Sequence, residues 1–239
     1  MNRDLIKQLL CYSYKNGLSH IPSALSMLSY IDILFTDKFI TLDDIICIGK
    51  PFGAQAYYLV WERLKLIANI EKLSSGVKHD EVPFVAFSEE TMGNALGVAS
   101  GIALTTTKNV WVNISDASLQ MGNTLEAIGF IGHHQLKNIF LTVDYNNSQV
   151  TGKTSEILDV GPVTQLLINY SWDFHFVDGY DHKQIITVMN KLKRCRPTAV
   201  FFKTIKGFGV PEMELNPKKW HYRKLNEKDL ALFLKSSEV

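Results

Sequence analysis

Residues 109–147 read NVWVNISDASLQMGNTLEAIGFIGHHQLKNIFLTVDYNN. The stretch opens and closes with apolar runs of strand length, residues 109–114 and 138–144. Between them, residues 124–134 carry leucine, isoleucine and alanine at helical spacing. A strand, a helix and a second strand in this order predict two parallel strands joined by a covering helix. The fold class expected from this stretch is α/β, with a parallel sheet flanked by helices.

The same alternation extends in both directions along the chain. Further strands are predicted at residues 45–49, 172–177 and 197–204, and further helices at 4–14, 19–35, 53–67, 91–107, 162–170, 183–193 and 226–236. Ser19 is expected to cap the second helix, and residues 71–87 are expected to form a loop. Because no flexible linker interrupts the pattern, residues 1–239 are predicted to form one domain, with an irregular C-terminal segment at about 207–239.

Composition excludes several classes of protein. Apolar residues make up 46% of the 239 residues and charged residues 21%, which predicts a folded core. A net charge of +1 provides no basic field for nucleic acid. The sequence contains no apolar run long enough to predict an export signal or a membrane span. Cys11, Cys47 and Cys195 are predicted to be reduced core thiols, which favours the cytoplasm.

Polar residues follow both strands of the opening stretch. Ser115, Asp116 and Ala117 come after the first strand, and residues 144–147 (Asp-Tyr-Asn-Asn) come at the end of the second. Ligands of parallel sheets bind at this edge, and one strand–helix–strand unit brings the two segments side by side. A carboxylate, a carboxamide and a loop carbonyl suit Mg2+ and leave room for a diphosphate. Taken alone, the same residues could also be ordinary turn and capping residues.

Residues 115–152 resemble the thiamine diphosphate motif of transketolases, in which Gly-Asp-Gly precedes an Asn by one strand–helix–strand unit. Other segments of the chain resemble that family in the same order: GLSHIPSALS (17–26), CIGKPFGAQAYY (47–58), TMGNALGVASGIA (91–103), KTIKGFGV (203–210) and NPKKWHY (216–222). The resemblance covers nearly the whole chain. It implies the thiamine diphosphate-binding fold of the family's diphosphate-binding (PP) domain.

The resemblance also implies roles for individual residues. Mg2+ would be bound by the side chains of Asp116 and Asn146 and by the main-chain carbonyl of Ser148. Residues implied to bind the cofactor, besides Asp116 and Asn146, are Ser23, Glu90, Thr91, Met92, Ser115, Ala117, Lys206 and His221. Catalytic positions that face the substrate or the reacting centre are implied for His20, His79 and His221.

Three departures from the family pattern bear on function. Pro51-Phe52 stands where the family has Gly-His, and Met121-Gly122 stands where it has Glu-Gly. Ser115 and Ala117 replace glycines that would reach left-handed backbone angles at little cost, so cofactor affinity is placed in doubt. The first two changes remove polar groups from the expected cavity, which indicates either an unusual substrate or a degraded site.

The function implied is that of the diphosphate-binding subunit of a two-chain transketolase that moves a two-carbon ketol unit from a ketose to an aldose. Thiamine chemistry needs a glutamate beside the pyrimidine ring, and the family carries it in a second domain. We therefore expect a heterotetramer in which two copies of this chain pair with two copies of a separate pyrimidine-binding subunit. Residues 92–104 and 129–134 are the expected interface helices. The alternatives are the α subunit of a 2-oxo acid dehydrogenase or decarboxylase, and a non-catalytic subunit that keeps the fold.

Overall fold

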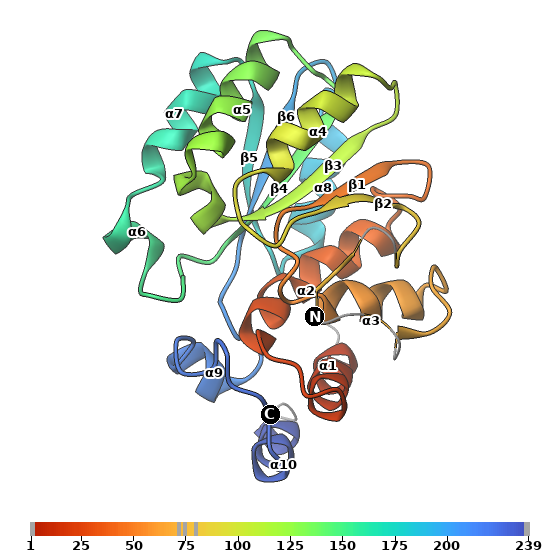
Figure 1. The fold of residues 1–239 in the computed structure, drawn as a ribbon, viewed down its shortest axis with the longest axis vertical. Helices are drawn as coiled ribbons and strands as arrows, with labels where there is room; N and C mark the ends of the chain where they lie inside the picture. Colours follow the sequence, from red (N-terminus) through yellow and green to blue (C-terminus); the bar gives the residue numbers. More distant parts are fainter. Residues whose placement is uncertain (1–2, 71–72, 74–75, 79–80, 237–239) are drawn as a thin grey trace.

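A computed structural model describes residues 3–70, 73, 76–78 and 81–236. Its centre is a parallel six-stranded sheet with the order β2-β1-β3-β4-β6-β5 (Figure 1). The strands are β1 (Ile45–Ile48), β2 (Val85–Ser88), β3 (Val110–Ser115), β4 (Ile139–Tyr145), β5 (Asp173–Asp178) and β6 (Thr198–Lys203). The predicted α/β class with a parallel sheet is therefore confirmed.

Helices cover both faces of the sheet (Figure 1). On one face lie α4 (Ala95–Leu104), α5 (Gly122–His133) and α7 (Gly161–Asn169). On the other lie α2 (Ile21–Thr36), α3 (Gln55–Arg63) and α8 (His182–Lys191), and α1 (Arg3–Lys15) packs against α2 and α3. The remaining helical segments are η2 (Asp116–Gln120), α6 (Thr154–Ile157), α9 (Pro211–Leu215) and α10 (Glu227–Ser236), of which α10 packs against α1.

Two hydrophobic cores, one on each face, hold these layers together. Val110, Val112 and Ile114 of β3 are buried in the core beneath α4, α5 and α7. Trp111, between them, is buried in the core on the opposite face. Because successive side chains of a strand alternate between faces, a strand covered on both faces is apolar over most of its length. This explains why the central strands are continuous apolar runs in the sequence.

The register of β3 and β4 determines where the polar residues lie. Ser115 pairs with Asp144, so the residues that follow both strands reach the same edge of the sheet. This adjacency was predicted from the strand–helix–strand unit. Strand order reverses between β1 and β3, and such a switch point opens a crevice at the carboxyl ends of the strands.

Several local predictions were wrong. Strand β2 lies at the end of the segment predicted as a loop. It was not predicted because four residues at a sheet edge are too few to show a periodic pattern. Ser19 does not cap α2: His20, in a left-handed conformation with φ 58°, precedes the helix, and Ser19 Oγ lies 2.9 Å from its Nδ1. Helix α3 ends at Arg63, because Lys65 adopts a φ of 59°.

The cysteine and membrane predictions can also be compared with the structure. Cys47 is buried, whereas Cys11 and Cys195 are exposed, so only one of the three is a core residue; all three are free thiols. The exposed pair lies at the outer side of α1 and in the turn before β6, where apolar neighbours in the sequence do not imply burial. Within the described ranges, no helix is both long enough and apolar enough to cross a bilayer.

Candidate active site

A cavity of about 660 Å3 opens at the carboxyl edge of the sheet. It is formed by the segments that follow β1, β2, β3, β4 and β6, together with the start of α2 and the segment before α10. Its lining comprises His20, Ser23, Gly49, Lys50, Pro51, Phe52, Glu90, Thr91, Met92, Ser115, Ala117, Asn146, Ser148, Gln149, Val150, Thr151, Lys206, His221 and Tyr222.

The structure brings almost every predicted site residue to this one cavity. Asp116 is not part of the lining but is buried directly behind it, between Ser115 and Ala117. His79 lies outside the described residues. The remaining predicted residues all line the cavity, namely His20, Ser23, Glu90, Thr91, Met92, Ser115, Ala117, Asn146, Ser148, Lys206 and His221. Residues distant in the sequence therefore converge as expected, and their individual roles remain proposals.

Asp116 is a buried carboxylate with polar contacts but no ion pair among the residues that the structure describes. It is 1% exposed, and its two oxygens accept hydrogen bonds from the backbone N–H groups of Ala117 at 2.8 Å and Asn147 at 2.6 Å. Burial, and next the nearby carboxylate of Asp144, raise its pKa to about 6. A bound cation would relieve both effects, because it supplies the opposite charge that favours the ionised form.

Two further oxygens accompany Asp116 at the ends of these strands. Asn146 Oδ1 accepts the N–H of Ser148 at 2.9 Å, and the carbonyl of Ser148 accepts a hydrogen bond from Lys206 Nζ at 3.1 Å. A carboxylate, an amide oxygen and a carbonyl are the hard ligands that Mg2+ prefers. The donor set therefore fits a magnesium ion at this edge.

The replacement of glycine at residues 115 and 117 does not strain the backbone. Ser115 has φ −92° and ψ 164°, an extended conformation open to any residue, and Ala117 is not among the residues with positive φ. The structure thus shows no left-handed angle at these two residues, and a lower cofactor affinity stays a prediction. Ser115 Oγ accepts the N–H of Ser118 at 3.3 Å and so caps η2. Small side chains at both positions keep this turn accessible from the cavity.

Lys206 and two histidines form another part of the lining. Lys206 Nζ lies 3.1 Å from His221 Nδ1, and the backbone N–H of His20 donates to the His221 carbonyl at 2.9 Å. Burial, followed by the charge of Lys206, lowers the pKa of His20 to about 4 and that of His221 to about 3. Burial, and next Lys50, lower the pKa of Lys206 to about 8. At neutral pH both imidazoles are therefore uncharged.

Aromatic rings surround His20 at the mouth of the cavity. Phe52 stacks on the imidazole with a centroid separation of 5.0 Å, and Tyr222 meets it edge-on at 5.1 Å. Phe52 is 41% exposed and Tyr222 64% exposed, although both are large aromatic side chains. The departure from the family pattern at Phe52 thus gives the mouth an apolar wall.

Several residues that shape the site were assigned no role from the sequence. Glu89 closes the start of α4 by accepting the N–H groups of Gly93, Asn94 and Ala95 at 2.7 to 3.1 Å, and so anchors the loop of residues 90–92. Lys50 lines the cavity after β1, and Asp144 lies beneath it at the end of β4. The rule that identified Asp116, a polar residue just after a strand, would also have found Lys50.

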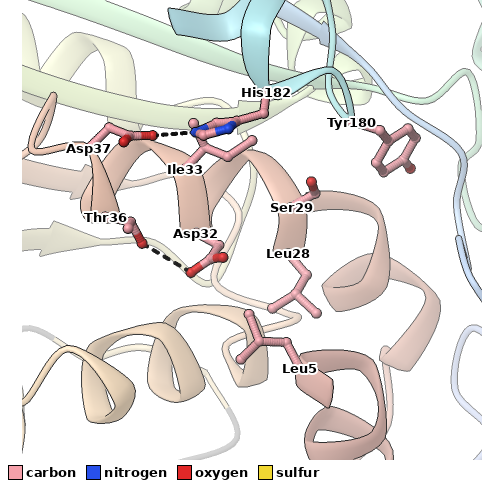
Figure 2. Close-up of a pocket in the computed structure, with 9 residues that line it drawn as sticks. All are labelled: Leu5, Leu28, Ser29, Asp32, Ile33, Thr36, Asp37, Tyr180 and His182. Carbon is pink, nitrogen blue, oxygen red and sulfur yellow. Dashed lines mark hydrogen bonds and ion pairs between the residues drawn. The ribbon is translucent and has the colours of Figure 1, made fainter. Parts of the chain in front are cut away.

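A second cavity, of about 240 Å3, lies away from this edge, between α1, α2 and the start of α8 (Figure 2). Its carboxylates already have partners: Asp32 contacts Thr36 and Arg63, and Asp37 lies 2.7 Å from His182 Nε2. None of the predicted site residues lines it. We therefore assign the chemistry to the larger cavity.

Residues 86–236, more than half of the chain, match the family described as transketolase, thiamine diphosphate binding domain. The chain belongs to this family. Transketolase of Rattus norvegicus is 26% identical over 87% of this chain and 37% of its own length. One of the subunits of the apulose-4-phosphate transketolase of Actinobacillus succinogenes is 28% identical over 65% of this chain and 59% of its own length.

Solved transketolases share the fold of this chain. The enzyme from Leishmania mexicana superposes with a TM-score of 0.75 at 17% identity, over 99% of this chain and 40% of its own. The enzyme from Campylobacter jejuni gives a TM-score of 0.70 at 17% identity, over 100% of this chain and 43% of its own. The chain thus spans about two fifths of the length of these full transketolases, and it corresponds to their thiamine diphosphate-binding domain.

Proposed function

We propose that this chain is the diphosphate-binding subunit of a two-chain transketolase, which transfers a two-carbon ketol unit from a ketose to an aldose. The observation that carries the proposal is the convergence of the transketolase-like segments on one cavity, in a chain that belongs to the thiamine diphosphate-binding family. Thiamine diphosphate would supply the carbon nucleophile that accepts the two-carbon unit. The free thiols favour the cytoplasm as its location.

The residues of the cavity divide into three proposed tasks. Asp116, Asn146 and the Ser148 carbonyl would hold Mg2+. Residues proposed to hold the cofactor itself are Ser23, Glu90, Thr91, Met92, Ser115, Ala117, Lys206 and His221. His20, His221 and His79 would face the substrate. Because the imidazoles of His20 and His221 are neutral, each can donate a hydrogen bond to a sugar oxygen without placing a second cation beside Lys206.

We propose that a separate pyrimidine-binding subunit completes the site, in a heterotetramer with two copies of each chain. Helix α4 offers a face for this contact: a Cβ added at Gly97 or Gly101 would meet no atom of the described residues outside its own helix within 4 Å, and Val98 and Leu104 are exposed apolar residues of the same helix. Phe130 of α5 is also exposed. The Actinobacillus succinogenes relative is named as one subunit of its transketolase, which supports a divided enzyme.

The proposed substrate is a sugar with an apolar face. Phe52 and Tyr222 give the mouth aromatic surface. Such surface packs against the C–H groups of a sugar better than against a charged group. This favours an unusual sugar over an ordinary ketose phosphate as the donor or acceptor.

Calorimetry with thiamine diphosphate and Mg2+ tests the proposal on the native assembly, purified through a tag on this chain. We expect Mg2+-dependent binding, followed by ketol transfer from at least one donor in a panel of ketoses and ketose phosphates. Asp116→Ala should abolish both. Asp32→Ala, in the second cavity, is the control and should leave binding intact. Absence of cofactor binding by the native assembly would overturn the proposed function.

A further inference from the structure

Asp144 lies beneath the cavity at the end of β4 and is fully buried. Its two carboxylate oxygens accept hydrogen bonds from Ser26 Oγ at 2.8 and 2.9 Å, Thr204 Oγ1 at 2.5 Å and Asn146 Nδ2 at 2.9 Å. The ammonium group of Lys50 forms an ion pair with the same carboxylate. We call these five residues the Asp144 cluster. They come from α2, from the end of β4 and from the segments that follow β1 and β6.

Burying such a cluster at the sheet costs desolvation free energy. Moving a carboxylate and an ammonium out of water costs several kcal/mol, and well-packed apolar side chains in their place are often at least as stable. The neighbouring strand shows that this solution was available, because Phe202 of β6, which pairs with Asp144, lies in the core of that face and carries no polar side-chain group. The cluster therefore calls for an explanation beyond stability of the fold.

One effect of the cluster is on Asn146. Its Nδ2 donates to both Asp144 and Ser26 Oγ, the latter at 3.0 Å. The nitrogen of the amide therefore points toward these two buried side chains. The oxygen end must then lie on the other side, where Oδ1 accepts the N–H of Ser148. The carboxylate of Asp144 thus selects which end of this amide faces the cavity, since a carboxylate accepts but cannot donate.

The second effect is on Lys50. Its side chain is 10% exposed and lines the cavity, and its Nζ is held between the Asp144 carboxylate and the Ser23 carbonyl, the latter at 3.3 Å. A lysine side chain has four rotatable bonds and would otherwise sample many positions. The ion pair fixes this cation beside the turn that carries Asp116. Burial raises the pKa of Asp116, and the positive charge of Lys50 opposes that rise.

We propose that Asp144 is a positioning residue that orients the amide oxygen of Asn146 toward the dication and fixes the ammonium of Lys50 beside the diphosphate. The proposal rests on the proposed function, because it needs that cofactor in the cavity. Outer partners of this kind commonly change metal affinity by about 10-fold to 100-fold when they are removed.

Three variants of the native assembly separate positioning from support of the fold. Lys50→Met leaves Asp144 buried without its cation and should lower the melting temperature. Combining it with Asp144→Leu removes both charges and the oxygen that accepts from Asn146 Nδ2, so part of the lost melting temperature should return. Positioning should not recover: the apparent Kd for Mg2+, from calorimetric titrations in the presence of thiamine diphosphate, should stay about 10-fold to 100-fold above the wild-type value in the double variant.

Ser26→Ala provides a milder variant in case the double variant does not fold. It deletes one oxygen that contacts both Asp144 and Asn146, and should weaken Mg2+ binding by several-fold at an unchanged melting temperature. The matched control is Asp32→Asn combined with Arg63→Met, an ion pair whose carboxylate lines the second cavity. This pair should leave the Mg2+ affinity unchanged.

The outcomes distinguish this inference from the proposed function. If the wild-type assembly binds no thiamine diphosphate with Mg2+, the proposed function fails and the inference fails with it. If the wild type binds and a folded double variant binds equally well, Asp144 only supports the fold, and the inference alone is overturned. If the double variant is unfolded, unchanged Mg2+ affinity in Ser26→Ala overturns the inference. Weaker Mg2+ binding in a variant that melts like the wild type supports it.

Discussion

The exposed face of α4 allows a test in which two measured quantities should move in opposite directions. Gly97 is the third residue of α4, and a Cβ built on it would meet no atom of the described chain outside its own helix within 4 Å. A larger residue therefore fits this chain without strain. If a partner subunit packs against this face, the same residue would enter the space that the partner occupies.

The magnitudes follow from helix propensity and packing. Replacing Gly97 by Gln should stabilise the dissociated chain by up to about 0.7 kcal/mol, which is the difference between the two residues in a helix interior. For a chain of this size that corresponds to a rise of roughly 2 °C in melting temperature. Overpacking a closely fitted interface costs about 1 to 3 kcal/mol. The dissociation constant of the assembly should then rise by about 5-fold to 140-fold.

Sedimentation velocity over a dilution series measures the assembly, and thermal unfolding of the dissociated chain measures its stability. Asn190→Gln is the control, because Asn190 is exposed on α8, on the opposite face of the sheet. It should change neither quantity by more than a few tenths of a kcal/mol. A Gly97→Gln chain that is more stable and still assembles with wild-type affinity would refute the reasoning, because α4 would then face solvent in the assembly.

Two further predictions concern stability. Burial and Lys206 lower the pKa values of His20 and His221 to about 4 and about 3, from 6.5 in the unfolded chain, so protons bind the unfolded chain first as the pH falls. The free energy of unfolding should therefore decrease as the pH drops from 6.5 toward 4. Urea titrations should show this slope, and His20→Asn should flatten it; an equal slope in the variant would contradict the assignment. Gly53→Ala should destabilise the chain by about 2 to 4 kcal/mol, because Gly53 has φ 105° and its new Cβ would lie 3.0 Å from the backbone N of Ala24. Urea unfolding that shows no loss would mean that the turn after Phe52 can relax.

The central part of the fold could be predicted because its strands and helices produce patterns of apolar residues that are local in the sequence. Strands β3 and β4 are buried on both faces and are therefore continuous apolar runs, which a sequence shows directly. The position of Asp116 beside Asn146 followed from connecting those two strands. Strand β2 gave no such signal, since four residues at an edge, with one exposed and two half-buried, carry neither a run nor an alternation.

Partners distant in the sequence could not be predicted from local patterns. Ser26 and Asp144 are 118 residues apart and Lys50 and Asp144 are 94 apart, and no spacing rule connects them. Ser26 in the sequence looks like one of several small polar residues on a buried helix. Only the packing of α2 across the sheet shows that its hydroxyl meets a carboxylate. Similarly, only the structure shows that Ser115 has ordinary backbone angles where the family has glycine.

The two carboxylates at this edge differ in what neutralises them, and the difference argues for where a dication would bind. Asp144 already has the ammonium of Lys50 and the hydroxyl groups of Ser26 and Thr204. Asp116 has two backbone N–H donors and, within the described ranges, no ion pair. A divalent cation gains most where a buried negative charge is least compensated, because burial strengthens the attraction that solvent would otherwise screen. Under the proposed function, Lys50 would therefore serve the metal site by satisfying Asp144, which leaves Asp116 as the carboxylate that still needs a positive charge.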